Sequence, residues 1–156
     1  MKKREVLLIL LLVAFDQLTK YIVEATMRLY QSIEVIEGFF SITFVTNTGA
    51  GWSILEGQMV FFYIMTVIAS ATMIYYIVKS DKNNKLFRLA FCLMLAGALG
   101  NFIDRLMFQH VRDFLDFIIF NYDFPVFNIA DTQLSIGFAL LALETFLSRN
   151  NDNAEI

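Results

Sequence analysis

Long apolar runs alternate with polar segments along this chain. Four runs are long enough to cross a bilayer as helices, which takes about 20 residues. They cover approximately residues 5–23, 59–78, 86–103 and 129–147. The pattern predicts an all-α membrane protein with four transmembrane helices, forming a single domain over residues 1–156. The polar tail, residues 148–156, is predicted to be unstructured.

The first connection, residues 24–58, is too polar to be a span. Within it, residues 33–45 mix Ile, Val, Phe and Thr with alternating polar residues. This alternation favours two or three short strands with a turn at Gly38. The other long connection, residues 104–128, lies on the same side of a four-span protein.

Basic residues collect on one side of this arrangement. Eight of the twelve lysines and arginines precede the first run, join the second and third runs, or follow the fourth: Lys2, Lys3, Arg4, Lys79, Lys82, Lys85, Arg88 and Arg149. The positive-inside rule then predicts cytoplasmic termini, with residues 24–58 and 104–128 outside. The basic start and apolar run resemble a signal peptide, but no small-residue cleavage site follows, so we expect a retained span.

Composition excludes several classes of protein. The single cysteine, Cys92, is incompatible with a disulfide framework or a multi-cysteine metal site, and we expect it to be an inert buried thiol. The single histidine, His110, excludes a multi-histidine metal centre and has no evident nucleophile beside it. No basic stripe indicates nucleic-acid binding. We therefore expect neither a metal nor a cofactor.

Acidic residues stand at the outer ends of the third and fourth runs. Gly97, Asn101 and Asp104 are spaced to share one helix face, and Ala96 with Gly100 allows another helix to approach closely. Asp104 is expected to pair with Arg105 as a structural ion pair at the helix end, and direct catalysis is the alternative role for Asp104.

The fourth run begins with Asn128 and Asp131, which suit the first turn of a helix by capping it. Capping alone is one explanation of Asp131. Asp113 lies in a strand-like stretch in which alternation turns it away from Arg112, and a surface aspartate is its simplest explanation.

Two carboxylates near each other also support a chemical function. Nearby like charges do not readily ionise together, so the pair shares a proton, and one carboxylate activates water while the other donates the proton. Charged groups at the edge of a hydrocarbon layer are costly and mark functional sites. The sequence leads us to the hypothesis that Asp113 and Asp131 meet near the membrane surface.

Five motifs occur in one order over nearly the whole chain. They are DQLTK at 16–20, NTGAGWS at 47–53, GALGNFIDR at 97–105, VRDF at 111–114 and FNIAD at 127–131. In this order and spacing the chain resembles the type II (lipoprotein) signal peptidases.

The resemblance implies a membrane aspartic endopeptidase with four transmembrane helices and a small extracytoplasmic β-cradle, in the bacterial cell (inner) membrane. It implies cleavage of diacylglyceryl-modified prolipoproteins before the lipidated cysteine, inhibition by the cyclic peptide globomycin, and a monomer. Its catalytic pair falls on Asp113 and Asp131. Its supporting or substrate-binding residues fall on Asp16, Lys20, Asn47, Gly49, Asn101, Asp104, Arg105 and Asn128.

The chain departs from the family pattern at three positions. Gly51 and Trp52 stand where alanine and phenylalanine are more common, with little expected effect. Arg112 stands where an apolar residue is more common. In an extended strand Arg112 points away from Asp113, whereas in a tight turn it would favour the ionised carboxylate.

Two other classes of function remain open at this point. A small proton- or cation-coupled membrane carrier would use intramembrane carboxylates, although these acids cluster at one membrane face and no broken-helix repeats are present. A non-catalytic assembly factor would use the polar residues only for helix packing.

Overall fold

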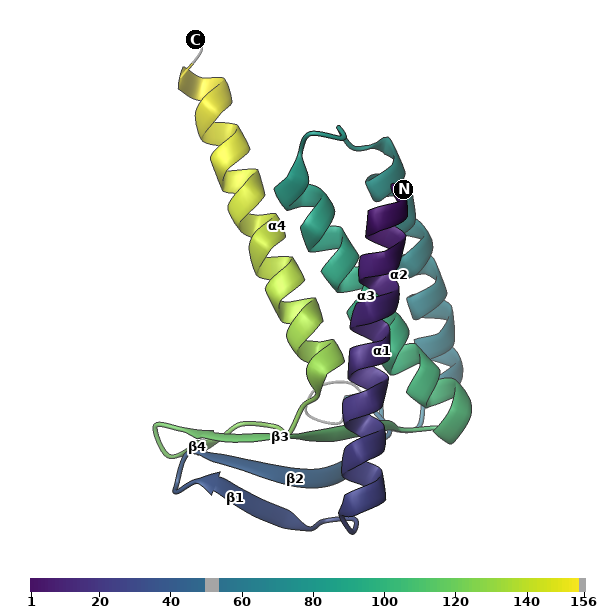
Figure 1. The fold of residues 1–156 in the computed structure, drawn as a ribbon, viewed down its shortest axis with the longest axis vertical. Coiled ribbons are helices and arrows are strands. Elements are labelled where there is room, and N and C mark those ends of the chain that lie inside the picture. Colours follow the sequence, from purple (N-terminus) through teal and green to yellow (C-terminus); the bar gives the residue numbers. More distant parts are fainter. Residues whose placement is uncertain (50–53, 155–156) are drawn as a thin grey trace.

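The computed structural model describes residues 1–49 and 54–154 and confirms the predicted class of membrane protein (Figure 1). Within these residues, four helices are long and apolar enough to cross a membrane. The helices are α1 (Lys3–Thr26), α2 (Met59–Lys79), α3 (Lys85–Phe108) and α4 (Ile129–Ala154), and the strands are β1 (Ser32–Ile36), β2 (Phe40–Asn47), β3 (Val111–Ile119) and β4 (Tyr122–Asp123). The strands lie across one end of the bundle, and both termini lie at the other (Figure 1).

Helix α3 is the centre of the bundle, because it packs against α1, α2 and α4. The apolar core follows its length, and Cys92 is buried in that core as predicted. The core residues are Ile9, Met73, Ile77, Phe91, Cys92, Leu95 and Ala96. By contrast, most apolar side chains of α2 point outward, as expected of a helix that faces lipid.

Two glycines of α3 let its neighbours approach closely. A Cβ at Gly97 would overlap the carbonyl oxygen of Ala130 in α4, and one at Gly100 would lie 2.5 Å from Oδ2 of Asp16 in α1. The close approach predicted at Gly100 is therefore confirmed, and Gly97 allows a second one. They bring the first turn of α4 and the middle of α1 against the same stretch of α3.

The four strands form one antiparallel sheet in the order β1-β2-β3-β4. The predicted turn at Gly38 joins β1 to β2, with φ 64° at the glycine. Val45 of β2 pairs with Asp113 of β3. A second apolar cluster of Val23, Met27, Phe44 and Phe114 fixes the sheet to the end of α1.

The helices extend beyond the predicted spans, and the tail differs most. Residues 148–154 were expected to be unstructured, but α4 continues through them to Ala154. Helix α3 continues to Phe108 and ends where Gln109 adopts a left-handed conformation, φ 63°. The departures at Gly51 and Trp52 lie outside the described residues.

One ion pair at the end that carries the termini was not anticipated. Arg88, counted above only as a positive charge, is 5% exposed and binds both carboxylate oxygens of Glu5 at 2.8 Å. It also donates to the carbonyl oxygen of Ile77. This arginine therefore holds α1, α2 and α3 together instead of facing water.

The close approach at Gly100 predicts a specific sensitivity. Gly100→Val places a Cβ against Asp16 and Ala130, and both neighbours must shift. We expect the free energy of unfolding to fall by roughly 1–3 kcal/mol, measured by thermal unfolding in detergent. Ala71→Val on the exposed face of α2 is the matched control and should change little. Equal stability of the two variants would contradict the packing described here.

Candidate active site

Asp113 lies in the buried first half of β3 and is 2% exposed. Asn128 Nδ2 donates to its Oδ1 at 2.6 Å, and Asn47 Nδ2 donates to its Oδ2 at 3.2 Å. Strand pairing explains the second contact, because β2 carries Asn47 alongside the start of β3. Both carboxylate oxygens therefore accept hydrogen bonds from neutral amides.

Asp131 lies in the first turn of α4, as the capping pattern predicted. The backbone N–H of Asn128 donates to its Oδ2 at 3.1 Å, and the N–H of Asp131 donates to Asn128 Oδ1 at 3.0 Å. This reciprocal pair closes the start of the helix. The other oxygen, Oδ1, accepts from Asn101 Nδ2 at 2.7 Å. Asp131 therefore caps α4 with one carboxylate oxygen and binds Asn101 with the other.

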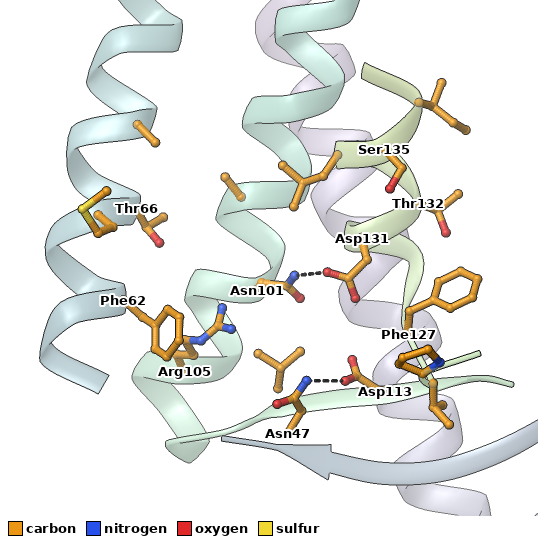
Figure 2. Close-up of a pocket in the computed structure, with 18 of the residues that line it drawn as sticks. Asn47, Phe62, Thr66, Asn101, Arg105, Asp113, Phe127, Asp131, Thr132 and Ser135 are labelled. Atoms are coloured by element: carbon orange, nitrogen blue, oxygen red, sulfur yellow. Dashed lines mark hydrogen bonds between the residues drawn. The ribbon is translucent and has the colours of Figure 1, made fainter. Parts of the chain in front are cut away.

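Two amides connect the carboxylates. The side-chain oxygen of Asn101 accepts from Asn128 Nδ2 at 3.1 Å and from Lys20 Nζ at 3.0 Å. With its oxygen occupied in this way, Asn101 must turn its NH₂ group toward Asp131. The aspartates from β3 and α4 are therefore oriented by one continuous set of donors. Figure 2 shows the hydrogen bonds of Asn101 to Asp131 and of Asn47 to Asp113.

A buried ion cluster lies behind these amides. Lys20 is fully buried, with Nζ 2.9 Å from Asp16 Oδ2 and 3.6 Å from Asp104 Oδ2. The other oxygen of Asp16 accepts from the backbone N–H of Ala130 at 2.9 Å, so α1 also contributes to capping α4. Asp16 and Lys20 are four residues apart, so they share one face of α1.

The expected ion pair between Asp104 and Arg105 is wrong. Asp104 instead accepts from Arg112, with NH2 to Oδ1 at 2.7 Å and Nε to Oδ2 at 3.2 Å. Arg112 also binds Glu24 at 2.7 Å. Neighbouring residues on a helix point about 100° apart, so Asp104 and Arg105 face different partners. Arg112 points away from Asp113, as an extended strand predicts.

Arg105 belongs to a different surface of α3. Its NH2 donates to the carbonyl oxygen of Gly49 at 2.8 Å, and its guanidinium lies 4.5 Å from the centre of the Phe62 ring. The backbone N–H of Gly49 in turn donates to Asn47 Oδ1. Arg105 and Gly49 therefore support the loop after β2, and Arg105 lines the same space as the aspartates.

That space is a cavity of about 780 Å³. Both aspartates line it, together with mainly apolar side chains from α2, α4 and the segment before α4 (Figure 2). The lining residues that the sequence analysis did not identify include Phe62, Met65, Thr66, Ala69, Val111, Phe124, Val126, Phe127, Leu134 and Ser135. The chain holds 17 phenylalanines, but their number does not identify which of them line the cavity. Which faces of the helices line the cavity is decided by how the helices pack against one another.

The surroundings keep a proton in the site. Burial, followed by the negative charge of Asp131, raises the pKa of the Asp113 carboxyl from 3.8 to about 7, although hydrogen bonds from Asn128 and Asn47 oppose the rise. Near neutral pH a substantial fraction of the molecules therefore keeps the Asp113 carboxyl protonated. A neutral carboxylic acid beside a carboxylate can donate a proton to one group while a water loses a proton to the other.

The chain is similar to known proteins over most of its length. A family model described as signal peptidase (SPase) II matches residues 8–147. The lipoprotein signal peptidases of Staphylococcus aureus strains JH9 and Newman are each 45% identical over 146 residues, covering 94% of this chain and 90% of theirs.

Two solved structures, both described as bacterial membrane enzymes solved by the in meso method, have the same fold. One is 44% identical with a TM-score of 0.90 and covers 95% of this chain and 90% of its own. The other is 46% identical with a TM-score of 0.83 and covers 90% of each.

Replacing Asp113 tests its environment. The folded carboxyl binds its proton more tightly than the unfolded one, so its burial penalty is absent below about pH 4 and complete above about pH 7. We expect Asp113→Asn to gain stability relative to the unchanged protein as pH rises through this window, by up to roughly 4 kcal/mol. Chemical unfolding in detergent at several pH values measures the difference. Asp123→Asn, at an exposed carboxyl of β4, should show no such trend. A pH-independent difference for Asp113→Asn would show that its carboxyl has an ordinary pKa.

Proposed function

This chain belongs to the signal peptidase II family, and we propose that it cleaves its prolipoprotein substrates with Asp113 and Asp131 as the catalytic pair. The whole chain, residues 1–156, would then form one integral-membrane aspartic endopeptidase domain. Membership of a peptidase family favours this function over a cation-coupled carrier or an assembly factor.

The observation that carries the proposal is the convergence of a buried carboxylate, Asp113, and a half-buried one, Asp131, on one cavity, with no ion pair to either among the described residues. The hydrogen bonds of Asp113 come from two asparagine amides, and those of Asp131 from an amide and a backbone N–H. A contacting lysine or arginine would hold both carboxylates ionised. Amide donors orient the pair and leave it able to share a proton.

We assign the proton to Asp113 and the role of base to Asp131. Asp131 takes a proton from water as the water oxygen attacks the scissile carbonyl carbon, and Asp113 gives its proton to the carbonyl oxygen. The tetrahedral intermediate then returns a hydroxyl proton to Asp113 as its C–N bond breaks. Asp131 passes its proton to the departing nitrogen, which restores the starting state without an acyl-enzyme.

The other predicted site residues support this chemistry in two ways. We infer that Asn47, Asn101 and Asn128 orient the carboxylates, and that the cluster of Asp16, Lys20 and Asp104 holds these amides in place. Arg105 and Gly49 lie beside the cavity, where we propose that they contact the substrate backbone.

The cavity walls support a lipid-modified substrate. Met65, Ala69, Leu134 and Ile136 line it from helices at the level of the bilayer. We propose that acyl chains of a diacylglyceryl cysteine lie along these residues and that the chain is cut just before that cysteine. All of the proposed site residues come from one chain, so we propose that a monomer is active.

The charge distribution supports an orientation. Both termini and the α2–α3 connection lie at the end opposite the sheet (Figure 1), and Lys2, Lys3, Lys82 and Lys85 lie there. The positive-inside rule therefore supports cytoplasmic termini and a site facing outward from the bacterial cell (inner) membrane.

Substitution of each aspartate tests the assignment. Asp113→Asn and Asp131→Asn should each lower the rate of processing of a lipidated prolipoprotein on the order of 10²–10⁴-fold, because each removes one proton-transfer group. Gel separation of precursor and mature forms measures the rate, and globomycin should block the unchanged enzyme. Asp116→Asn, outside the cavity on the same strand, is the control. Full cleavage by either dyad variant would remove that residue from the mechanism.

The shared proton also predicts a pH dependence. Because Asp113 must be protonated and its pKa is about 7, kcat/KM should fall about tenfold for each pH unit above that value. Processing rates at low substrate concentration between pH 5 and about 9 measure this limb. A rate that keeps rising above neutral pH would contradict Asp113 as the proton donor.

A further inference from the structure

The β3–β4 hairpin projects beyond the helix bundle and carries apolar side chains at its tip. Phe120 is 100% exposed, and its neighbours Ile118, Ile119 and Tyr122 are 41%, 42% and 55% exposed. The first four residues of β3 are buried and the last two are exposed. One strand thus runs from the cavity to a tip whose apolar side chains are largely exposed.

The tip has an unusual backbone for its sequence. Phe120 and Asn121 form a two-residue turn between the paired residues Ile119 and Tyr122, and both have positive φ, 50° and 62°. Asparagine suits this turn, but a phenylalanine in the left-handed region is disfavoured by about 1–2 kcal/mol. Neither conformation nor burial within the protein explains a phenylalanine here, which points to a partner outside the chain.

The position of the hairpin identifies that partner. The strand after the tip leads through Phe127, which pairs with Leu115, directly into Ile129, the first residue of the α4 span. The hairpin therefore lies at the level where the apolar span begins, and Figure 1 shows it extending sideways across the helix ends. Beside a membrane-spanning bundle, this location is the lipid–water interface.

We propose that the hairpin tip, Ile118–Tyr122, inserts into the bilayer leaflet on the sheet side and anchors the outer wall of the cavity there. Aromatic side chains are favoured at this depth, where the ring is apolar and its surroundings are partly wet. No lysine or arginine occurs between residues 113 and 148. The insertion is therefore apolar and requires no anionic lipid.

The anchor has a consequence for the site. Phe124, Pro125, Val126 and Phe127 follow the hairpin and line the cavity. Fixing the tip in lipid holds this wall at the boundary between headgroups and acyl chains, where a lipid-modified peptide arrives. This consequence rests on the proposed function, whereas the insertion itself does not.

A depth measurement tests the insertion without an activity assay. Phe120→Cys, in a Cys92→Ala background, is spin-labelled in phosphatidylcholine nanodiscs, and its collisions with oxygen and with a water-soluble nickel chelate are compared. We expect oxygen, which concentrates in lipid, to dominate. Glu37→Cys, at the exposed β1–β2 turn farther from the helices, is the control and should collide mainly with nickel. Adding anionic lipid should change neither result.

Three outcomes would overturn the proposal. Nickel access at residue 120 equal to that at residue 37 would place the tip in water. Spin–spin broadening that disappears on dilution with unlabelled protein would show a second copy as the partner. Insertion that requires anionic lipid would refute the apolar mechanism. Because no turnover is measured, a failure here is distinct from loss of processing in the aspartate variants.

Discussion

The structure depends on one fully buried lysine. Lys20 brings a positive charge between Asp16 and Asp104, and all three side chains are excluded from solvent. Removing Lys20 would leave Asp16 as an uncompensated buried charge, which is far more costly than a missing surface pair. Through Asp16 the cluster also caps α4, and through Asn101 it reaches Asp131. The same cluster therefore fixes the geometry of three helices and of the candidate site.

The four aspartates in and behind the cavity are separated into two groups by the kind of partner they have. Cations neutralise Asp16 and Asp104, whereas amides and a backbone N–H contact Asp113 and Asp131. This separation follows from strand alternation in β3, which directs Arg112 toward Asp104 and its neighbour Asp113 toward the cavity. A shift of β3 by one residue would direct Arg112 toward the cavity and Asp113 toward Asp104. The raised pKa of Asp113 is thus a consequence of register as well as of burial.

The sequence correctly predicts those features that depend only on residues close together in the chain. Apolar length predicts the helices, Gly38 marks the hairpin turn, and capping chemistry predicts Asp131 at the start of α4. The errors concern long-range pairing and helix ends. Asp104 binds Arg112, eight residues away, because the end of α3 and the start of β3 fold back on each other. Which face of α2 lines the cavity depends on how that helix is rotated against α3. The residues of α2 do not by themselves indicate this rotation.

The direction of β3 connects the chemistry to the membrane. At its start the strand is enclosed by α1, α3 and β2, which remove water from around Asp113. Toward its end no helix covers it, so its side chains become exposed. A short strand that is paired to β2 from Val111 to Phe117 links the position of one end to that of the other. The depth of the sheet relative to the bilayer and the placement of the Asp113 carboxyl are therefore not independent. The proposed cleavage would depend on this coupling, since an error of a few ångströms in depth would separate the two carboxylates from the bond to be cut.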